Sequence, residues 1–232
     1  MFLKLVLLSL LFSTAASQYL YAVDVSVPLG YSQIQCLQQA KYSNLLVRGF
    51  KPDGKTGLVD TDGISTYKLV QNNNMAIGVS IYMEPDAGAK NTGGQQFDML
   101  YQGLTNAGIH VRQVFVQVTE GDQTWNYDHN ANVDFLNSLF LRAQQLGILI
   151  GIYTGPADWQ TITGNSVTML PADAQLWYYN VYWDGVTGET VPSFDDFVAF
   201  GPFKKANVGV KQFATKEQVC GLTVNRDVYL KA

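Results

Sequence analysis

Short apolar segments that alternate with helical stretches are the feature that most constrains how this chain folds. Each segment is short enough for a strand and too continuous to have one face in water. Residues 63–73, 95–106 and 133–146, which lie between some of these segments, have the spacing of amphipathic helices. The seven apolar segments are residues 20–25, 44–50, 76–82, 113–118, 149–153, 175–181 and 208–213.

Strands that are buried on both faces and alternate with helices predict an α/β fold with a parallel sheet. Seven or more such units favour a closed (β/α) barrel, and an open doubly wound sheet is the alternative. The helical spacers shorten after Leu149, which indicates an irregular TIM-like barrel whose final third is rich in strands. No linker or low-complexity tract divides residues 18–232, so we expect one domain there.

Residues 1–17 have the pattern of a secretory signal peptide. Lys4 precedes an apolar run over residues 5–12, and small residues follow at positions 15–17, so we expect cleavage before Gln18. The run is far shorter than the roughly 20 apolar residues that span a bilayer. The sequence therefore predicts a secreted protein, extracellular or lumenal, without membrane insertion.

Charge and motifs exclude several classes of partner. The formal charge of −4 becomes −5 without Lys4, which argues against nucleic acid and anionic membranes. The two histidines, His110 and His129, are too few for a zinc site, and we expect both at the surface. The phosphate-binding glycine motifs and the Gly-x-Ser-x-Gly nucleophile motif are also missing from the sequence. We therefore expect no metal, no cofactor and no partner subunit.

The chain has two cysteines, Cys36 and Cys220. In an oxidising compartment, such a pair would most simply form a disulfide that ties the start of the domain to its end. Two buried free thiols are the alternative.

The remaining chemistry at the predicted strand ends is that of carboxylates and aromatic rings. Glycoside hydrolysis fits, because it uses carboxyl groups on a substrate whose flat sugar faces stack on aromatic side chains. Core or rim packing is the other interpretation of the aromatic residues. The densest aromatic group comprises Trp177, Tyr178, Tyr179, Tyr182 and Trp183.

Short sequence motifs that are typical of one enzyme family occur, in that family's order, along nearly the whole chain after residue 18. They include Tyr21-Ala22-Val23-Asp24-Val25-Ser26, Val47-Arg48-Gly49-Phe50, Gly151-Ile152-Tyr153-Thr154, Leu176-Trp177-Tyr178, Lys211-Gln212-Phe213 and Cys220-Gly221. Together they resemble the family 25 glycoside hydrolases, the muramidase-type lysozymes, and especially their animal and protist members. The resemblance implies an α/β barrel that cleaves the β-1,4 bond between N-acetylmuramic acid and N-acetylglucosamine in bacterial peptidoglycan, without a metal. It also implies a role in innate antibacterial defence or in the digestion of bacteria.

The catalytic residues that the resemblance implies are only partly present. Asp24 matches the family's first carboxylate, at the end of the first strand. The family's Asp-x-Glu pair falls on Gln117 and Thr119, so both of its carboxylates are replaced. Near the C-terminus, where the family has Asp two residues before Asn, Asn225 and Asp227 stand in reversed order.

A neighbouring carboxylate could replace the missing acid. Glu120 directly follows Thr119, the position where the family has its Glu. Because side chains alternate across a strand, Glu120 points toward the site only if a bulge or an early strand end changes its direction. Glu84 and Asp86 are further candidates. We predict Asp24 and Glu120 as the catalytic pair. The predicted substrate contacts are Tyr82, Glu84, Gln117, Thr119, Tyr153, Trp177, Tyr179 and Asp227.

These residues leave three hypotheses open. The first is a secreted lysozyme-type hydrolase with a rearranged acid. The second is a lysozyme-like protein that binds peptidoglycan with little or no hydrolysis, in which Gln117 and Thr119 hydrogen-bond the sugar. The third is a secreted scaffold or regulator with a vestigial cleft.

Overall fold

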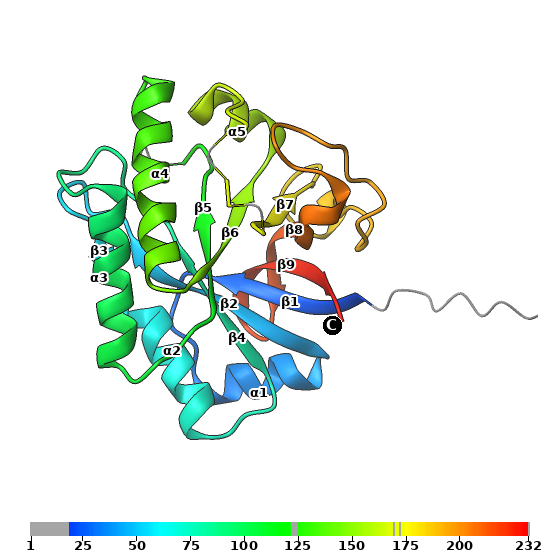
Figure 1. Cartoon of the computed structure of the whole chain (residues 1–232). Helices are drawn as coiled ribbons and strands as arrows, with labels where there is room; N and C mark the ends of the chain where they lie inside the picture. The colour runs from blue at the N-terminus through cyan, green and yellow to red at the C-terminus, as the bar shows by residue number, and fades with distance from the viewer. Residues whose placement is uncertain (1–18, 122–124, 169, 172, 232) are drawn as a thin grey trace, which may run out of the picture.

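Eight strands form a closed barrel in the computed structural model, which describes residues 19–121, 125–168, 170–171 and 173–231 (Figure 1). The predicted signal peptide lies outside these residues. The barrel strands are β1 (Tyr19–Val25), β2 (Tyr42–Lys51), β4 (Gly78–Met83), β5 (Gln113–Gln117), β6 (Leu149–Thr154), β7 (Gln175–Tyr179), β8 (Val208–Val219) and β9 (Leu222–Leu230).

The barrel closes through one antiparallel strand. Neighbouring strands from β1 and β2 through β8 pair in parallel, whereas β9 runs antiparallel to both β8 and β1. A short strand, β3 (Leu58–Val59), adds to the end of β2. The predicted irregular TIM-like barrel with a strand-rich final third is confirmed, and the open sheet is excluded by the β1–β2 and β1–β9 pairings. The apolar-run criterion missed β9, because polar residues alternate with apolar ones along it.

Helices cover the side of the barrel that is built from its earlier strands (Figure 1). They are α1 (Tyr31–Gln39), α2 (Thr61–Asn72), α3 (Gly93–Asn106), α4 (His129–Gln145) and α5 (Pro156–Thr163). The sequence pattern predicted α2, α3 and α4. It missed α1, which buries Ile34 and Leu37 beneath a polar surface, and α5, which has eight residues.

The core has two parts, inside and outside the barrel. The outer part lies between the strands and the helices and includes Trp159, Phe97 and Leu139. The inner part fills the barrel with Trp177, around which Tyr82, Phe115 and Tyr153 pack with ring centroids 5.9, 5.6 and 4.2 Å away. Because successive side chains alternate across each strand, residues two positions beyond these core residues lie at the C-terminal mouth of the barrel.

A disulfide joins Cys36 on α1 to Cys220 in the turn between β8 and β9. Its sulfur atoms are 2.10 Å apart, and the bridged residues are 184 positions apart in the sequence. The predicted disulfide is confirmed, and the alternative of two free thiols is excluded. In the described part of the chain, no helix is long and apolar enough to cross a bilayer.

The long connection from β7 to β8 covers the outer surface of these strands without an α-helix and is held by a buried lysine. Lys211 on β8 has no exposed side-chain surface. Its Nζ donates to Asp196 Oδ2 at 2.5 Å and to the carbonyl oxygen of Val191 at 2.6 Å. Tyr178 Oη and Asn180 Nδ2 also donate to Asp196, each at 2.7 Å. Burial lowers the pKa of Lys211, and the Asp196 carboxylate opposes that shift.

Replacing Lys211 by Met should destabilise the protein by about 3 kcal/mol, because it removes one partner of a buried ion pair. The free energy of unfolding in denaturant measures the effect. Arg142→Met is the control, since the Arg142–Asp98 ion pair is about one-third exposed and should contribute about 1 kcal/mol or less. Equal losses in the two variants would contradict the role given to Lys211.

Candidate active site

Asp24 lies at the C-terminal end of β1 and points into the barrel mouth. Only 8% of its surface is exposed. Gln212 Nε2 donates to its Oδ2 at 2.7 Å, and Asn225 Nδ2 donates to its Oδ1 at 2.9 Å. Burial raises the pKa of Asp24 from 3.8 to about 6, although these two amides and Asp227 oppose the shift. A carboxyl group with this pKa exchanges its proton in the mildly acidic range.

The two amides that hold Asp24 are themselves fixed. Tyr153 Oη donates to Gln212 Oε1 at 3.0 Å, so the Gln212 amide nitrogen faces Asp24. The backbone N–H of Lys216 donates to Asn225 Oδ1 at 3.0 Å, which orients Asn225 in the same way. Asp24 therefore has a set position before any ligand arrives.

Asp227 lies beside Asp24 inside the barrel, with no exposed surface. Trp177 Nε1 donates to its Oδ1 at 2.8 Å, while its Oδ2 has no donor among the described residues. Burial, together with the charge of Asp24, raises the pKa of Asp227 well above its usual value. The interaction of the two carboxyl groups opposes the rise in the pKa of Asp24 and adds to the rise in the pKa of Asp227. The structure thus places this predicted substrate contact behind Asp24, out of reach of solvent.

Gln117 and Thr119 stand at the end of β5, on the same side of the strand as the core residue Phe115. Gln117 Nε2 donates to Thr119 Oγ1 at 2.9 Å. Both side chains are partly exposed. The mouth therefore has an amide and a hydroxyl where the resemblance implies two carboxylates.

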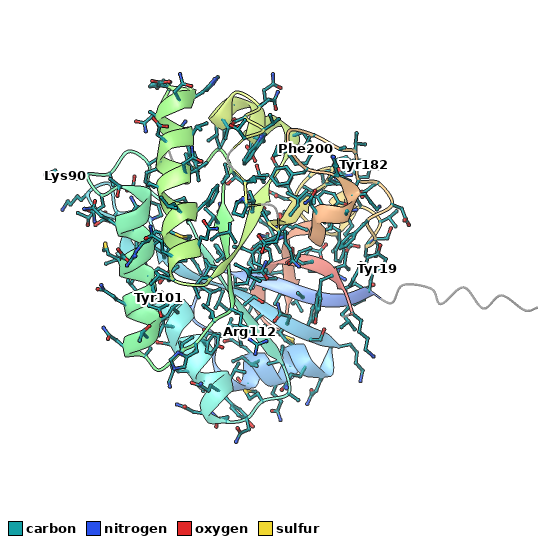
Figure 2. All side chains as sticks on the ribbon, viewed as in Figure 1. Tyr19, Lys90, Tyr101, Arg112, Tyr182 and Phe200 are labelled. Atoms are coloured by element: carbon teal, nitrogen blue, oxygen red, sulfur yellow. A yellow bond between two sulfur atoms is a disulfide. The ribbon has the colours of Figure 1, made fainter. Side chains whose placement is uncertain are left out.

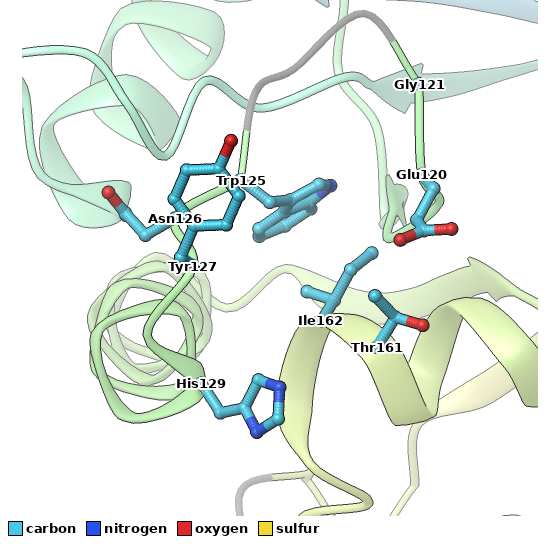
Figure 3. A pocket seen from close by; sticks show the side chains of 8 residues that line it. All are labelled: Glu120, Gly121, Trp125, Asn126, Tyr127, His129, Thr161 and Ile162. Carbon is cyan, nitrogen blue, oxygen red and sulfur yellow. The ribbon is translucent and has the colours of Figure 1, made fainter.

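Glu120 is exposed and lines a pocket next to the end of β5 (Figure 3). This pocket has a volume of about 640 Å³ and is also lined by Trp125, His129 and Ile162. The backbone N–H of Glu120 donates to Asp158 Oδ1 at 2.9 Å, which fixes where the strand end turns. Among the described residues, Asp24 accepts its hydrogen bonds from Gln212 and Asn225 and none joins it to Glu120, so the catalytic pairing of Glu120 with Asp24 stays a prediction. His110 and His129 are both exposed.

Glu84 lies at the end of β4 and is tied to a basic residue. Arg48 Nη1 donates to Glu84 Oε2 at 2.9 Å, and Arg48 Nε donates to the buried Asp60 at 2.7 Å. Asp86 is 3% exposed and accepts the backbone N–H of Gly54 at 2.9 Å, so it holds a loop. Of these two candidates for the acid, only Glu84 is partly exposed.

Aromatic residues form the floor and one wall of the mouth. Tyr82 and Trp177 are buried in the floor, with 5% and 1% of their surfaces exposed, whereas Tyr153 and Tyr179 are partly exposed. Tyr179 Oη donates to Asp158 Oδ2 at 2.6 Å. Asp158 was not predicted from the sequence; its position just after the strand Leu149–Thr154 was the signal that could have found it.

Within the described residue ranges, no group of three or more His, Cys, Asp or Glu side chains could hold a metal ion. The donors around Asp24 are amides and a tyrosine hydroxyl, which suit a carboxyl group that handles protons.

Comparison with known proteins identifies the family. Residues 15–213 match the family model described as Lysozyme-like protein 1. Lysozyme-like protein 1 of Caenorhabditis elegans is 47% identical over 214 residues, which cover 92% of this chain and 70% of the relative.

The chain belongs to the lysozyme-like protein 1 family.

More distant relatives connect this lysozyme-like chain with family 25 glycoside hydrolases. Probable GH family 25 lysozyme 4 of Dictyostelium discoideum is 28% identical, and the match covers 86% of this chain and 85% of the relative. A glycosyl hydrolase 25 of Streptococcus pneumoniae has the same fold, with a TM-score of 0.54, 16% identity and coverage of 91% and 86%. The modular Cpl-1 endolysin, solved with a peptidoglycan analogue, gives a TM-score of 0.56, 13% identity and coverage of 93% and 55%. The predicted resemblance is confirmed.

Proposed function

We propose that this lysozyme-like protein acts on the β-1,4 bond between N-acetylmuramic acid and N-acetylglucosamine in peptidoglycan, with Asp24 as the working carboxyl group. The observation that carries the proposal is the state of Asp24, which is buried at the barrel mouth, oriented by two fixed amides and raised in pKa to about 6. A general acid is most effective when its pKa lies near the working pH. Family membership and the peptidoglycan analogue bound by the Cpl-1 endolysin support the choice of substrate.

The mouth favours a route that needs one protein carboxyl group. Asp24 donates its proton to the glycosidic oxygen as the bond to the anomeric carbon breaks. The acetamido oxygen of the substrate attacks that carbon, as in the glycosidases that use substrate assistance. Water then opens the cyclic intermediate and returns a proton to Asp24. Gln117 and Thr119 offer hydrogen-bonding groups at the sugar.

The setting of this activity is also part of the proposal. A cleaved signal peptide over residues 1–17 would send the protein out of the cell, where the disulfide persists. There it would meet bacterial cell walls, either in antibacterial defence or in the digestion of bacteria.

Turnover of peptidoglycan should fall as the pH rises through about 6, because only protonated Asp24 donates a proton. With a single pKa of about 6, the rate at pH 8 should be about a hundredfold below the acidic plateau. Release of products from defined muropeptide oligomers, measured from pH 4 to pH 8 beside equilibrium binding, tests this expectation. A rate that rises steadily up to pH 8 would exclude Asp24 as the acid.

Binding without hydrolysis is the second candidate function. The specific observation in its favour is the Gln117–Thr119 pair, whose amide and hydroxyl can hydrogen-bond a sugar but cannot replace two carboxylates in catalysis. In the same experiment, this candidate requires saturable binding of the oligomers and no product above the background at any pH. Measurable turnover rules it out.

A further inference from the structure

An exposed aromatic pair lies in the turn that follows β7. Tyr182 and Trp183 have 70% and 58% of their surfaces exposed, and their ring centroids are 5.7 Å apart with planes inclined at 41°. Val186, 71% exposed, belongs to the same turn. Figure 2 shows Tyr182 on the outer edge of the molecule, far from Tyr101 on α3. Large apolar side chains gathered at a surface mark a site of interaction.

Hydrogen bonds within the turn hold these rings in place. The N–H of Tyr182 donates to the carbonyl of Gly188 at 2.9 Å, and Trp183 Nε1 donates to Thr187 Oγ1, also at 2.9 Å. A Cβ atom at Gly188 would lie 1.8 Å from the carbonyl oxygen of Trp183, so only glycine permits this close approach. Because the turn is already held in this conformation, the two rings lose little conformational entropy when a ligand stacks on them.

The turn is also connected to Asp24 through two residues, Lys216 and Asn225. Lys216 Nζ pairs with Asp184 Oδ2 at 2.8 Å, next to Trp183 in the chain. The backbone N–H of Lys216 donates to Asn225, whose amide donates to Asp24. In addition, the N–H of Gly185 donates to the carbonyl of Thr215 on β8 at 2.7 Å. The aromatic turn thus borders the same end of the barrel as the candidate active site.

We propose that Tyr182 and Trp183 form a stacking platform for a further N-acetylhexosamine ring of the glycan strand that is bound at Asp24. The inference rests on the proposed function and extends its site beyond the barrel mouth. The flat apolar face of a sugar ring covers the indole and phenol rings, while polar groups at the edge of the turn, such as the Asp184 carboxylate, meet its hydroxyl groups. The platform lengthens the site so that polymeric glycan binds better than short fragments.

Binding of β-1,4-linked N-acetylglucosamine oligomers to the full chain tests the platform. Trp183→Ala should weaken the affinity for the hexamer about tenfold, which corresponds to about 1.4 kcal/mol, and should leave the affinity for the dimer unchanged. Trp183→Phe keeps a flat ring and should stay within about threefold of the wild type. Tyr101→Ala, an aromatic deletion on the other side of the barrel, is the control and should bind both oligomers normally.

Fluorescence gives a second measurement if Trp183→Ala folds poorly. Trp159 and Trp177 are buried and Trp125 is only partly exposed, so iodide should quench Trp183, which is 58% exposed, most strongly, and the hexamer should protect it in the wild type. Wild-type binding of the hexamer without protection, or with unchanged affinity in Trp183→Ala, overturns the platform but leaves the proposed function standing. If the wild type binds neither the hexamer nor purified peptidoglycan, the proposed function fails, and the platform fails with it.

Discussion

Replacing Asp24 by Asn should lower the turnover of peptidoglycan at least a hundredfold, because it removes the carboxyl group that is proposed to act as the acid. The variant should still fold. Its amide nitrogen can donate to Gln212 Oε1 once the Gln212 amide flips, and the flipped nitrogen can then donate to the Tyr153 hydroxyl oxygen. Rates on defined muropeptides, measured with the unfolding transition of the same sample, separate lost chemistry from lost structure.

The stability of the same variant has a predicted dependence on pH. The pKa of Asp24 is higher in the folded chain, about 6, than its ordinary value of 3.8, so the folded state binds the proton more tightly. Its stabilising contribution is complete below about pH 3.8 and is lost as the pH rises through 6, by about 3 kcal/mol. Asp24→Asn lacks this loss, so its stability relative to the wild type should improve from pH 4 to pH 7.

Two outcomes would contradict the role of Asp24. One is an Asp24→Asn variant that keeps wild-type turnover, which would move the chemistry to another carboxyl group; Glu84→Gln and Glu120→Gln then identify it. The other is a wild type without turnover that gains it when Gln117→Asp and Thr119→Glu restore the family's pair. That result would assign the natural protein to binding.

Removing the Cys36–Cys220 disulfide should cost about 5 kcal/mol of folding stability. The bond closes a loop of 184 positions, and the loss of chain entropy in the unfolded state grows with the logarithm of loop length. The Cys36→Ala/Cys220→Ala variant should therefore unfold at a much lower denaturant concentration than the wild type. Comparison of the two free energies of unfolding measures the effect.

Reduction of the wild type provides the control for this prediction. Under a strong reductant, the wild type should unfold at the same midpoint as the double variant, whereas the variant itself should not respond. A loss below about 1 kcal/mol would show that the pairing of β9 with β8 and β1 already holds the chain ends together. It would contradict the stabilising role given to the bond.

The barrel could be predicted because its strands are buried on both faces, which makes them continuous apolar runs. β9 and α1 escaped this criterion for a shared physical reason: each has one largely polar side. On β9, the polar positions include Asn225 and Asp227, which point toward the candidate site. The polar residues that made the strand hard to predict are therefore the same ones that lie at the site. Pattern alone could not distinguish such a strand from a loop.

The sequence predicted Asp24 as the main residue of the candidate site, but not how the residues around it are arranged. Sequence spacing placed Glu120 one position after Thr119, but it could not show that the N–H of Glu120 donates to Asp158 or that Glu120 is exposed in a pocket with Trp125. The sequence predicts Asp227 as a substrate contact, whereas the structure shows it buried beside Asp24, with its pKa raised by burial and by the charge of Asp24. Both facts depend on tertiary contacts between distant segments, which no local pattern contains.

The candidate site can form only after β9, the antiparallel strand that closes the barrel, has been synthesised. Asp24 is among the first residues of the domain to be synthesised, whereas its partner Asn225 and its neighbour Asp227 come from the last strand. In a nascent chain in which β9 has not yet been synthesised, the barrel is open and Asp24 lacks the hydrogen bond from Asn225. Synthesis of β9 is thus the step that completes the surroundings of Asp24, and a nascent chain without β9 carries no finished site.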